Sequence, residues 1–132
     1  MFHAFALQGP GNSGKAATLL KLFNNLKKRY PSATIKYIHN NGDDISVIMS
    51  DINGRVVGIE TRGEPGKRLK NSLNAFVAAK CNTIFCPCRT KGVTVLWIKT
   101  LPLQYKIHFV EQKRAESEQT ATTVSLMRQA GI

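Results

Sequence analysis

A glycine-rich stretch near the start of the chain constrains the fold more than any other feature. Residues 9–15 read Gly-Pro-Gly-Asn-Ser-Gly-Lys, and they separate an apolar run from a stretch with helical periodicity. The preceding run, residues 2–7, is apolar except for His3, as expected for a strand buried on both faces. Beyond the glycines, apolar residues recur every three or four positions with Lys and Asn between them. The sequence therefore predicts a buried strand, a tight loop and a helix.

The three glycines allow the backbone of this loop to curl until several N–H groups point inward, and the following helix adds the positive end of its dipole. Such a loop can hold phosphate groups, and the ammonium group of Lys15 would reach the β- and γ-phosphates of a nucleotide. The alternative is a turn between strand and helix that binds no ligand. The residues expected to contact the nucleotide are Gly9, Pro10, Gly11, Asn12, Ser13, Gly14, Lys15, Ala16 and Ala17.

The pattern Gly-x-x-x-x-Gly-Lys resembles the Walker A loop of P-loop nucleoside-triphosphate-binding proteins, and the resemblance is carried by Gly9, Gly11, Gly14 and Lys15. The resemblance covers the first thirty residues and implies binding of ATP or GTP, with Mg²⁺ as a tentative cofactor. Ala16 stands where the family usually has a hydroxyl that ligates Mg²⁺. The loop is also similar to that of small-molecule kinases of the adenylate kinase kind, although Ala17 stands where those kinases have a threonine.

The charge of the chain favours an anionic partner. Its 132 residues are the size of one ordinary domain, and we expect residues 1–132 to form a single P-loop-like nucleotide-binding domain. Nineteen Lys and Arg face eight Asp and Glu, which gives a formal net charge of +11. The partner could be a nucleoside triphosphate, a nucleic acid or an acidic protein, and the alternative is a basic surface that only keeps the protein soluble. The oligomeric state is not indicated.

The cysteines and the hydropathy bear on the compartment. No apolar run approaches the roughly 18 residues that span a bilayer, and the first residues do not resemble a secretion signal. Cys81, Cys86 and Cys88 are odd in number and lack Cys-x-x-Cys spacing, so we do not expect them to bind a metal. Free thiols favour a reducing compartment. We therefore expect a cytoplasmic protein with no membrane partner.

The order of the remaining elements predicts an α/β fold. Strands alternating with helices, with a tight turn at Asn53-Gly54, favour a three-layer domain with a mostly parallel mixed sheet containing one β-hairpin, as in P-loop NTPases. Two chain reversals before the strand at 56–61 leave it parallel to the first strand. Asp51 then falls at the opposite edge from the glycine loop, and we exclude it as a metal ligand. We expect strands at 33–38, 45–49, 56–61, 83–86 and 105–110, and helices at 14–28, 67–80, 93–101 and 116–128.

Parallel strands bring the loop after residue 61 to the same edge as the glycine loop. Glu64 and Glu60 in this region are candidates to bind Mg²⁺ or to orient the attacking group, with Glu64 preferred because it lies beyond the strand. Either carboxylate could instead pair with Arg62 or Arg68. Lys67 and Arg68 begin a helix, where positive charge opposes the dipole, and this points to an anion nearby.

The loop after the strand at 83–86 reaches the same edge. Arg89 or Lys91 could stabilise charge on a transferring phosphoryl group, and Thr90 or Thr94 could bond a phosphate oxygen, as Arg62 could from the neighbouring loop. The expected catalytic residues are Lys15, Glu64 and Arg89.

These patterns favour a small ATP- or GTP-binding protein, either a nucleoside triphosphatase, and thus a hydrolase, or a phosphoryl-transfer enzyme. The alternative is a nucleotide-sensing or non-hydrolysing subunit of a larger assembly, because Ala16 removes a metal ligand and no aspartate ends a buried parallel strand. A further alternative is a nucleic-acid-binding module that uses the basic edge, although aromatic residues do not accompany the basic loops.

Overall fold

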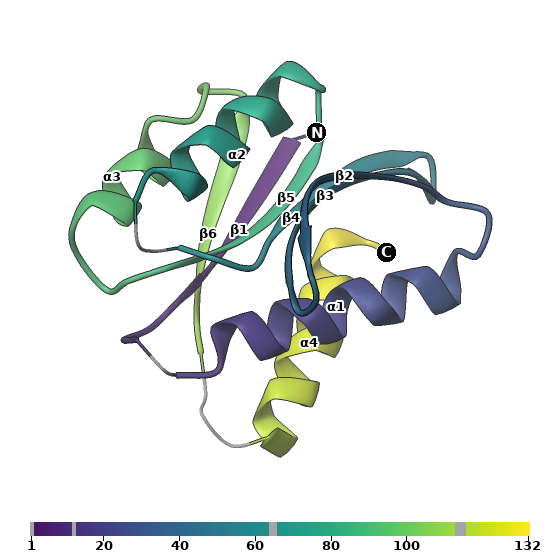
Figure 1. Ribbon diagram of the computed structural model, residues 1–132, viewed down its shortest axis with the longest axis horizontal. Helices are drawn as coiled ribbons and strands as arrows, with labels where there is room; N and C mark the ends of the chain where they lie inside the picture. Colours follow the sequence, from purple (N-terminus) through teal and green to yellow (C-terminus); the bar gives the residue numbers. More distant parts are fainter. Residues whose placement is uncertain (1, 12, 64–65, 113–115) are drawn as a thin grey trace.

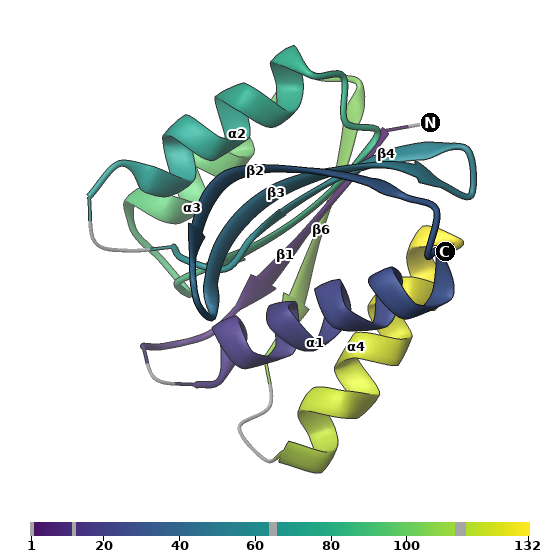
Figure 2. The ribbon, with the colours of Figure 1, turned by 45° about the vertical axis from the view of Figure 1, so that its right-hand side comes forward.

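The computed structural model of the chain describes residues 2–11, 13–63, 66–112 and 116–132. They form a three-layer α/β arrangement in which one sheet lies between two layers of helices (Figure 1). Helices α1 (Lys15–Arg29) and α4 (Glu116–Ala130) cover one face, and α2 (Arg68–Ala78) and α3 (Val93–Lys99) cover the other, as the turned view in Figure 2 also shows. None of the described helices is long and apolar enough to cross a membrane.

The sheet has the strand order β2-β3-β4-β5-β1-β6. The central strand β1 pairs in parallel with both β5 and β6, and β4 pairs in parallel with β5. The carboxyl ends of these four strands therefore meet at one edge, which confirms the expected mixed, mostly parallel sheet. The strands are β1 (Phe2–Gln8), β2 (Thr34–Asn41), β3 (Asp44–Ile52), β4 (Arg55–Glu60), β5 (Thr83–Cys88) and β6 (Tyr105–Glu111).

The expectation of a single hairpin is wrong, because β2–β3 and β3–β4 are both antiparallel pairs. The first connection is as tight as the second: Gly42 has φ 64° between β2 and β3, and Asn53 and Gly54 have φ 52° and 76° between β3 and β4. Positive φ at such positions lets a two-residue turn reverse the chain without splaying the strands. As a result β2 and β4 both run parallel to β1, and the β2–β3 turn lies at the glycine-loop edge.

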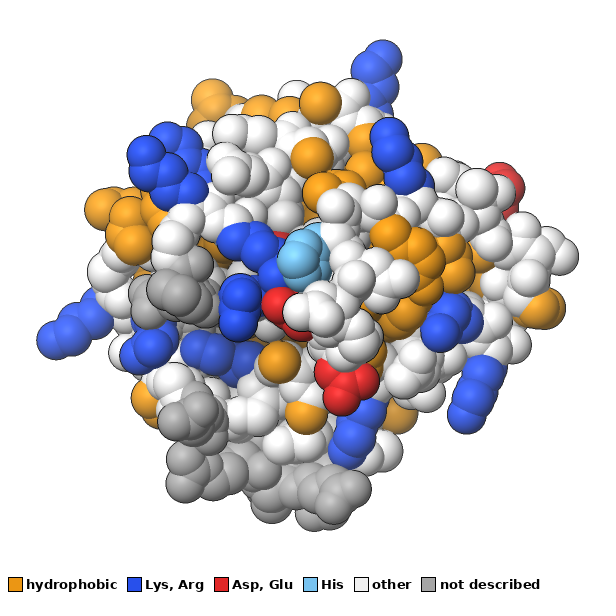
Figure 3. All heavy atoms as spheres, in the orientation of Figure 1, with side chains coloured by type: hydrophobic (Ala, Val, Ile, Leu, Met, Phe, Trp, Pro, Cys, Tyr) orange, Lys and Arg blue, Asp and Glu red, His pale blue; other side chains and the backbone are white. Residues whose placement is uncertain are grey.

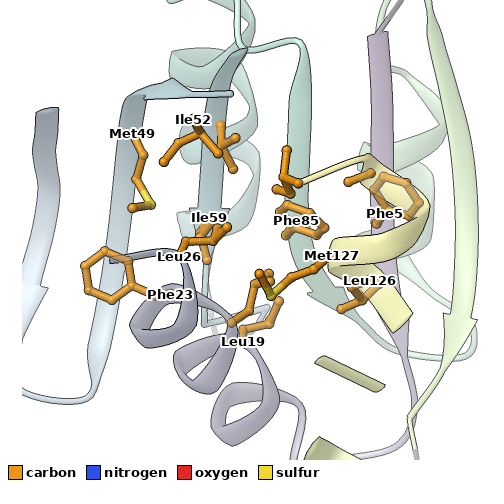
Figure 4. Packing of buried hydrophobic residues seen from close by; sticks show 14 of the residues in the cluster. Phe5, Leu19, Phe23, Leu26, Met49, Ile52, Ile59, Phe85, Leu126 and Met127 are labelled. Atoms are coloured by element: carbon orange, nitrogen blue, oxygen red, sulfur yellow. The ribbon is translucent and has the colours of Figure 1, made fainter. Parts of the chain in front are cut away.

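Two apolar cores hold the layers together. Side chains on β1 alternate, so that Phe5 and Leu7 face α1 and α4, whereas Ala4 and Ala6 face α2 and α3. Burial of each large side chain stabilises the fold by about 1.5–3 kcal/mol relative to exposure. Figure 4 shows the core under α1 and α4, which includes Phe5, Leu19, Phe23, Leu26, Met49, Ile52, Ile59, Phe85, Leu126 and Met127.

Helix α2 lies close to the sheet because β4 carries a glycine beneath it. A Cβ atom at Gly58 would lie 2.6 Å from Cγ of Phe76, which is fully buried. The absence of a side chain at Gly58 lets α2 lie close to β4, and Arg68 in the first turn of α2 reaches Glu60 at the end of β4. This placement determines which charges meet beside the glycine loop.

Candidate functional site

The glycine loop is fixed between β1 and α1 by its own hydrogen bonds. The backbone N–H of Gly9 donates to the carbonyl oxygen of Cys88 at 3.1 Å, and Ser13 Oγ donates to the carbonyl oxygen of Pro10 at 2.7 Å. Gly14 has φ 89°, a left-handed conformation that glycine adopts without steric cost, and α1 begins at the next residue. The loop is therefore anchored to the carboxyl end of β5 as well as to its own helix.

Lys15 extends across this loop toward β5. Its Nζ atom donates to the carbonyl oxygens of Gly9 at 2.5 Å and of Cys88 at 2.8 Å. Burial raises the pKa of the Cys88 thiol to about 11, although the charge of Lys15 partly offsets this effect. The thiol is therefore protonated at neutral pH and adds no negative charge beside Lys15.

A cavity of about 700 Å³ lies at this edge of the sheet. The glycine loop, the loops after β4 and β5, and the β2–β3 turn all contribute to its wall. Figure 3 shows lysine and arginine side chains gathered near the middle of the same face, beside a histidine and acidic side chains. The described lining residues are Gly11, Ser13, Gly14, Lys15, Ala16, Ala17, Asn41, Asp43, Asp44, Thr61, Arg62, Gly63, Pro87, Cys88, Arg89 and Thr94.

Three of the described lining residues are cationic: Lys15 at the start of α1, Arg62 after β4 and Arg89 after β5. Arg89 lies against the glycine loop, because a Cβ atom at Gly11 would be only 3.0 Å from its Nη2 atom. The backbone N–H of Arg89 donates to Oγ1 of the buried Thr94 at 3.0 Å, which fixes the start of this loop. The structure thus brings together three of the cations that the sequence assigned to one edge. The sequence also assigned Lys67, Arg68 and Lys91 to this edge, but these three are not among the described lining residues.

Asp44, at the start of β3, pairs with two arginines at the cavity. Its Oδ2 atom lies 2.7 Å from Nη1 of Arg68 and 3.6 Å from Nη1 of Arg62, and its Oδ1 atom accepts a hydrogen bond from Thr61 at 3.2 Å. Burial alone would raise the pKa of Asp44, but the hydrogen bond and charge of Arg68 outweigh it, so that the pKa is lowered. Asp44 is therefore ionised and offsets part of the positive charge.

Glu60 is fully buried at the end of β4 and does not line the cavity. Its carboxylate accepts hydrogen bonds from Ser46 Oγ at 2.5 Å, Ser72 Oγ at 2.6 Å, the backbone N–H of Arg62 at 2.9 Å and Arg68 Nη2 at 3.0 Å. Alternation along β4 turns Glu60 toward α2, away from the glycine loop and α1. The structure places it as an internal partner of Arg68.

The same contacts account for the positive charge at the start of α2. Arg68 is the first residue of this helix, where a cation opposes the helix dipole. The anions that offset it are Asp44 and Glu60, both within the chain, and they raise the pKa of Arg68 against the opposing effect of burial. The basic helix start is therefore no sign of a ligand at that position.

The described residues at the positions expected to ligate Mg²⁺ do not fit the ion that the Walker A resemblance implies. Ala16 has no hydroxyl, and the hydroxyl of Thr18 is buried and donates to Oε1 of Gln112 at 3.1 Å. Glu60 and Asp44 are held by arginine and hydroxyl donors. Among the residues that the structure describes, no group of three or more His, Cys, Asp and Glu side chains could hold a metal ion.

Some expected site residues lie elsewhere or cannot be placed. Asn12 and Glu64 lie outside the described residues, so their assignments stay predictions. Thr90 is exposed and is not among the lining residues; its carbonyl oxygen accepts a hydrogen bond from the side chain of Gln8 at 3.3 Å. Pro10 supports the loop through its carbonyl oxygen without lining the cavity.

The β2–β3 turn contributes Asn41, Asp43 and Asp44 to the cavity, and the sequence analysis did not anticipate these residues. A signal was present in the chain reversals. In an antiparallel meander, successive turns lie at opposite edges of the sheet. The β2–β3 turn therefore lies at the edge opposite the β3–β4 turn, which is the edge where β4 ends. Counting the chain reversals excluded Asp51 as a metal ligand at this edge, and the same count places Asp43 and Asp44 beside the glycine loop.

Comparison with protein families, with curated proteins and with solved structures finds no significant match to this chain. The function therefore has to be inferred from the residues of the cavity and the charges that surround them.

Proposed function

We propose that the chain binds a nucleoside triphosphate, ATP or GTP, through its phosphates at the edge of the sheet. One observation carries this proposal: Lys15, at the end of the glycine loop, shares a cavity with Arg62 and Arg89 from two other loops. The cavity volume of about 700 Å³ lies within the range of small-ligand sites. The position at the carboxyl ends of parallel strands is where ligands bind in open α/β sheets.

The geometry favours a nucleotide-responsive, poorly hydrolysing subunit over an efficient triphosphatase or phosphoryl-transfer enzyme. Hydrolysis requires a carboxylate or equivalent group that positions the attacking water. Glu60 is committed to Arg68, Ser46 and Ser72, and Ala16 offers no metal ligand. Of the carboxylates expected to act in catalysis, Glu64 is the one whose contacts are not described.

Binding would redirect side chains that now have partners within the chain. Lys15 would exchange the carbonyl oxygens of Gly9 and Cys88 for phosphate oxygens, and Arg62, whose side chain is 50% exposed, would turn from Asp44 toward the ligand. Arg89 would approach the phosphates across Gly11. Because these groups belong to three loops, the bound phosphates would tie the loops together, which is how a nucleotide-sensing subunit could report occupancy.

The test is calorimetric titration of the full chain with ATP and with GTP, using the parent, Lys15→Ala and Lys21→Ala. Lys21 is a matched control because it is a lysine of the same helix that does not line the cavity. We expect Lys15→Ala to weaken binding at least tenfold, about 1.4 kcal/mol, while Lys21→Ala stays close to the parent. Equal affinity of the parent and Lys15→Ala would contradict the proposal.

The same samples distinguish nucleotide from nucleic acid as the main ligand. Binding of DNA to a general basic surface falls steeply with salt, with a slope near −0.9 per phosphate contact. We expect triphosphate binding to persist at about 0.15 M salt and DNA binding to be weak there. Tight DNA binding that triphosphate does not displace, with no nucleotide binding, would favour the nucleic-acid-binding module instead.

A further inference from the structure

The described wall of the cavity lacks the apolar surface on which nucleotide sites usually stack the base. The described lining residues are glycine, alanine, proline, cysteine, hydroxyl, amide or charged residues, and none of them is aromatic or a large aliphatic residue. In the sequence, the residues between the described ranges of these loops, Asn12, Glu64 and Pro65, are not aromatic either. Recognition of a base usually uses an aromatic or apolar surface for stacking together with a few directed polar groups.

His39 lies beside the cavity, with its Nε2 atom 3.8 Å from Oδ2 of Asp44, but it is not among the described lining residues, and the larger aromatic rings lie elsewhere. Phe5 and Phe85 stack on each other with their centroids 5.4 Å apart, and both are buried in the core under α1. Tyr37 on β2 packs edge-on against Phe23, with the centroids 6.1 Å apart. Trp97 packs against the core under α2 and α3. No aromatic ring is found among the described residues that line the cavity.

Asn41 is the amide side chain among the described lining residues, and no aromatic or large aliphatic residue accompanies it there for stacking. Two other amide side chains near the glycine loop are packed behind it. Gln112 is 6% exposed, and its Oε1 atom accepts the hydrogen bond from Thr18. Gln119 on α4 lies so close to Gly14 that a Cβ atom there would be 2.2 Å from its Nε2 atom. Neither glutamine is among the lining residues.

The cationic side chains of the wall match the phosphates of a nucleotide rather than its base. Lys15, Arg62 and Arg89 approach the cavity from three loops, and guanidinium groups can bind phosphate oxygens through two parallel hydrogen bonds. Thr61 and Ser13 also line the wall, where their hydroxyl groups donate to Asp44 and to the carbonyl oxygen of Pro10. The three cationic groups suit phosphate oxygens and do not distinguish one base from another.

We infer that the site recognises a linear triphosphate chain irrespective of what is attached to it. ATP, GTP, CTP, UTP and inorganic tripolyphosphate are then ligands of comparable affinity, because each presents the same phosphate oxygens. This inference rests on the proposed phosphate-binding function and specifies its ligand class.

The experiment compares the dissociation constants of these five compounds for the full chain, by calorimetry in one buffer at about 0.15 M salt. All five constants are expected to lie within tenfold of one another, which corresponds to about 1.4 kcal/mol. A preference of more than tenfold for one base overturns the inference, and so does a tripolyphosphate that binds more than tenfold more weakly than ATP. Either result leaves the proposed function intact, whereas failure of all five to bind overturns both.

Variants separate the cavity from general attraction to a basic protein. Lys15→Ala and Arg89→Ala are each expected to weaken ATP and tripolyphosphate by the same factor, and Lys21→Ala is expected to weaken neither by more than about twofold. An equal loss in Lys21→Ala and Lys15→Ala would show that tripolyphosphate binds to the basic surface and would overturn the inference. So would a variant of Arg89 that weakens ATP alone, because that arginine would then contact the nucleoside.

Discussion

The guanidinium group of Arg68 lies 3.0 Å from the carboxylate of Glu60, a side chain with no exposed surface. Arg68 also reaches Asp44 at 2.7 Å, so one arginine joins the interior of the sheet to the wall of the cavity. The arrangement holds the end of β4 and the start of β3 against the first turn of α2. Its integrity determines where Arg62, two residues beyond Glu60, enters the cavity.

Replacing Arg68 with Met removes the partner of a buried carboxylate. We expect the free energy of unfolding to fall by about 3 kcal/mol or more, because an uncompensated buried charge is costly. Urea titration measures the loss, and Lys67→Met, an exposed neighbour, serves as the control, with an expected change within about 0.5 kcal/mol. The double variant Arg68→Met with Glu60→Gln should recover part of the loss. A loss of less than about 1 kcal/mol in Arg68→Met would contradict this account.

Gly58→Ala tests the close approach of α2 to the sheet. The new Cβ atom would lie 2.6 Å from the ring of Phe76, so we expect a loss of about 1–3 kcal/mol in the free energy of unfolding. Phe76→Leu in the same chain makes room for the methyl group, and the double variant should lose less than the sum of the two single variants. Strict additivity in urea titrations would show that the ring and the methyl group do not meet.

The histidine pair on β1 and β6 makes stability depend on pH. His3 Nδ1 and His108 Nε2 lie 3.0 Å apart, and burial first, then the charge of Lys106, lowers the pKa of His3. Burial, followed by the neighbouring His3, lowers the pKa of His108 from 6.5 as well. The unfolded chain therefore binds more protons below this value, and the free energy of unfolding falls as the pH drops through it.

Urea titrations between about pH 8 and pH 5 measure this dependence. The loss should level off once the pH is below the lowered pKa values of the folded protein. Replacing both histidines with Gln should flatten the curve over this range. The contribution of Asp44 is not involved, because its lowered pKa means that its stabilisation is lost only below its usual value of 3.8. An equal slope in the parent and the double variant would show that other groups dominate.

Ala16→Ser restores a hydroxyl at the position where the Walker A pattern usually has one. We expect Mg²⁺ to increase ATP affinity several-fold more in this variant than in the parent, because the parent lacks this ligand. Calorimetry with Mg²⁺ and with a chelator gives the comparison. Ala78→Ser is the control, because Ala78 is an exposed alanine of α2 that is not among the described lining residues. Identical Mg²⁺ dependence in all three proteins would indicate that the hydroxyl does not reach the metal.

The sequence predicted most of the fold because its periodicities are strong. The apolar run of β1, the helical repeat of α1 and the turn at Asn53-Gly54 each favour one structure, and the parallel pairs confirm the shared edge of the loops. Both chain reversals before β4 were predicted, but only the one at Asn53-Gly54 was counted as a hairpin. In each case the decisive signal was local.

The orientation of Glu60 could not be predicted in the same way. β4 is buried on both faces, so the alternation of apolar and polar residues does not indicate which side chains face α1 and which face α2. That choice depends on contacts with Ser46 and Ser72, which come from distant parts of the chain. Likewise, Arg68 gained its partners through tertiary packing rather than through its own helix.

The hydrogen bond from Lys15 to the carbonyl oxygen of Cys88 joins positions 73 apart in the sequence. During synthesis the glycine loop leaves the ribosome long before β5, and β5 must then insert between β4 and β1. Such non-local pairing between parallel strands forms slowly, because a long segment loses its freedom before the contacts compensate. A nascent chain therefore has the whole glycine loop yet lacks the neighbouring loops of the cavity, and the wall of the cavity forms only when β5 has joined the sheet.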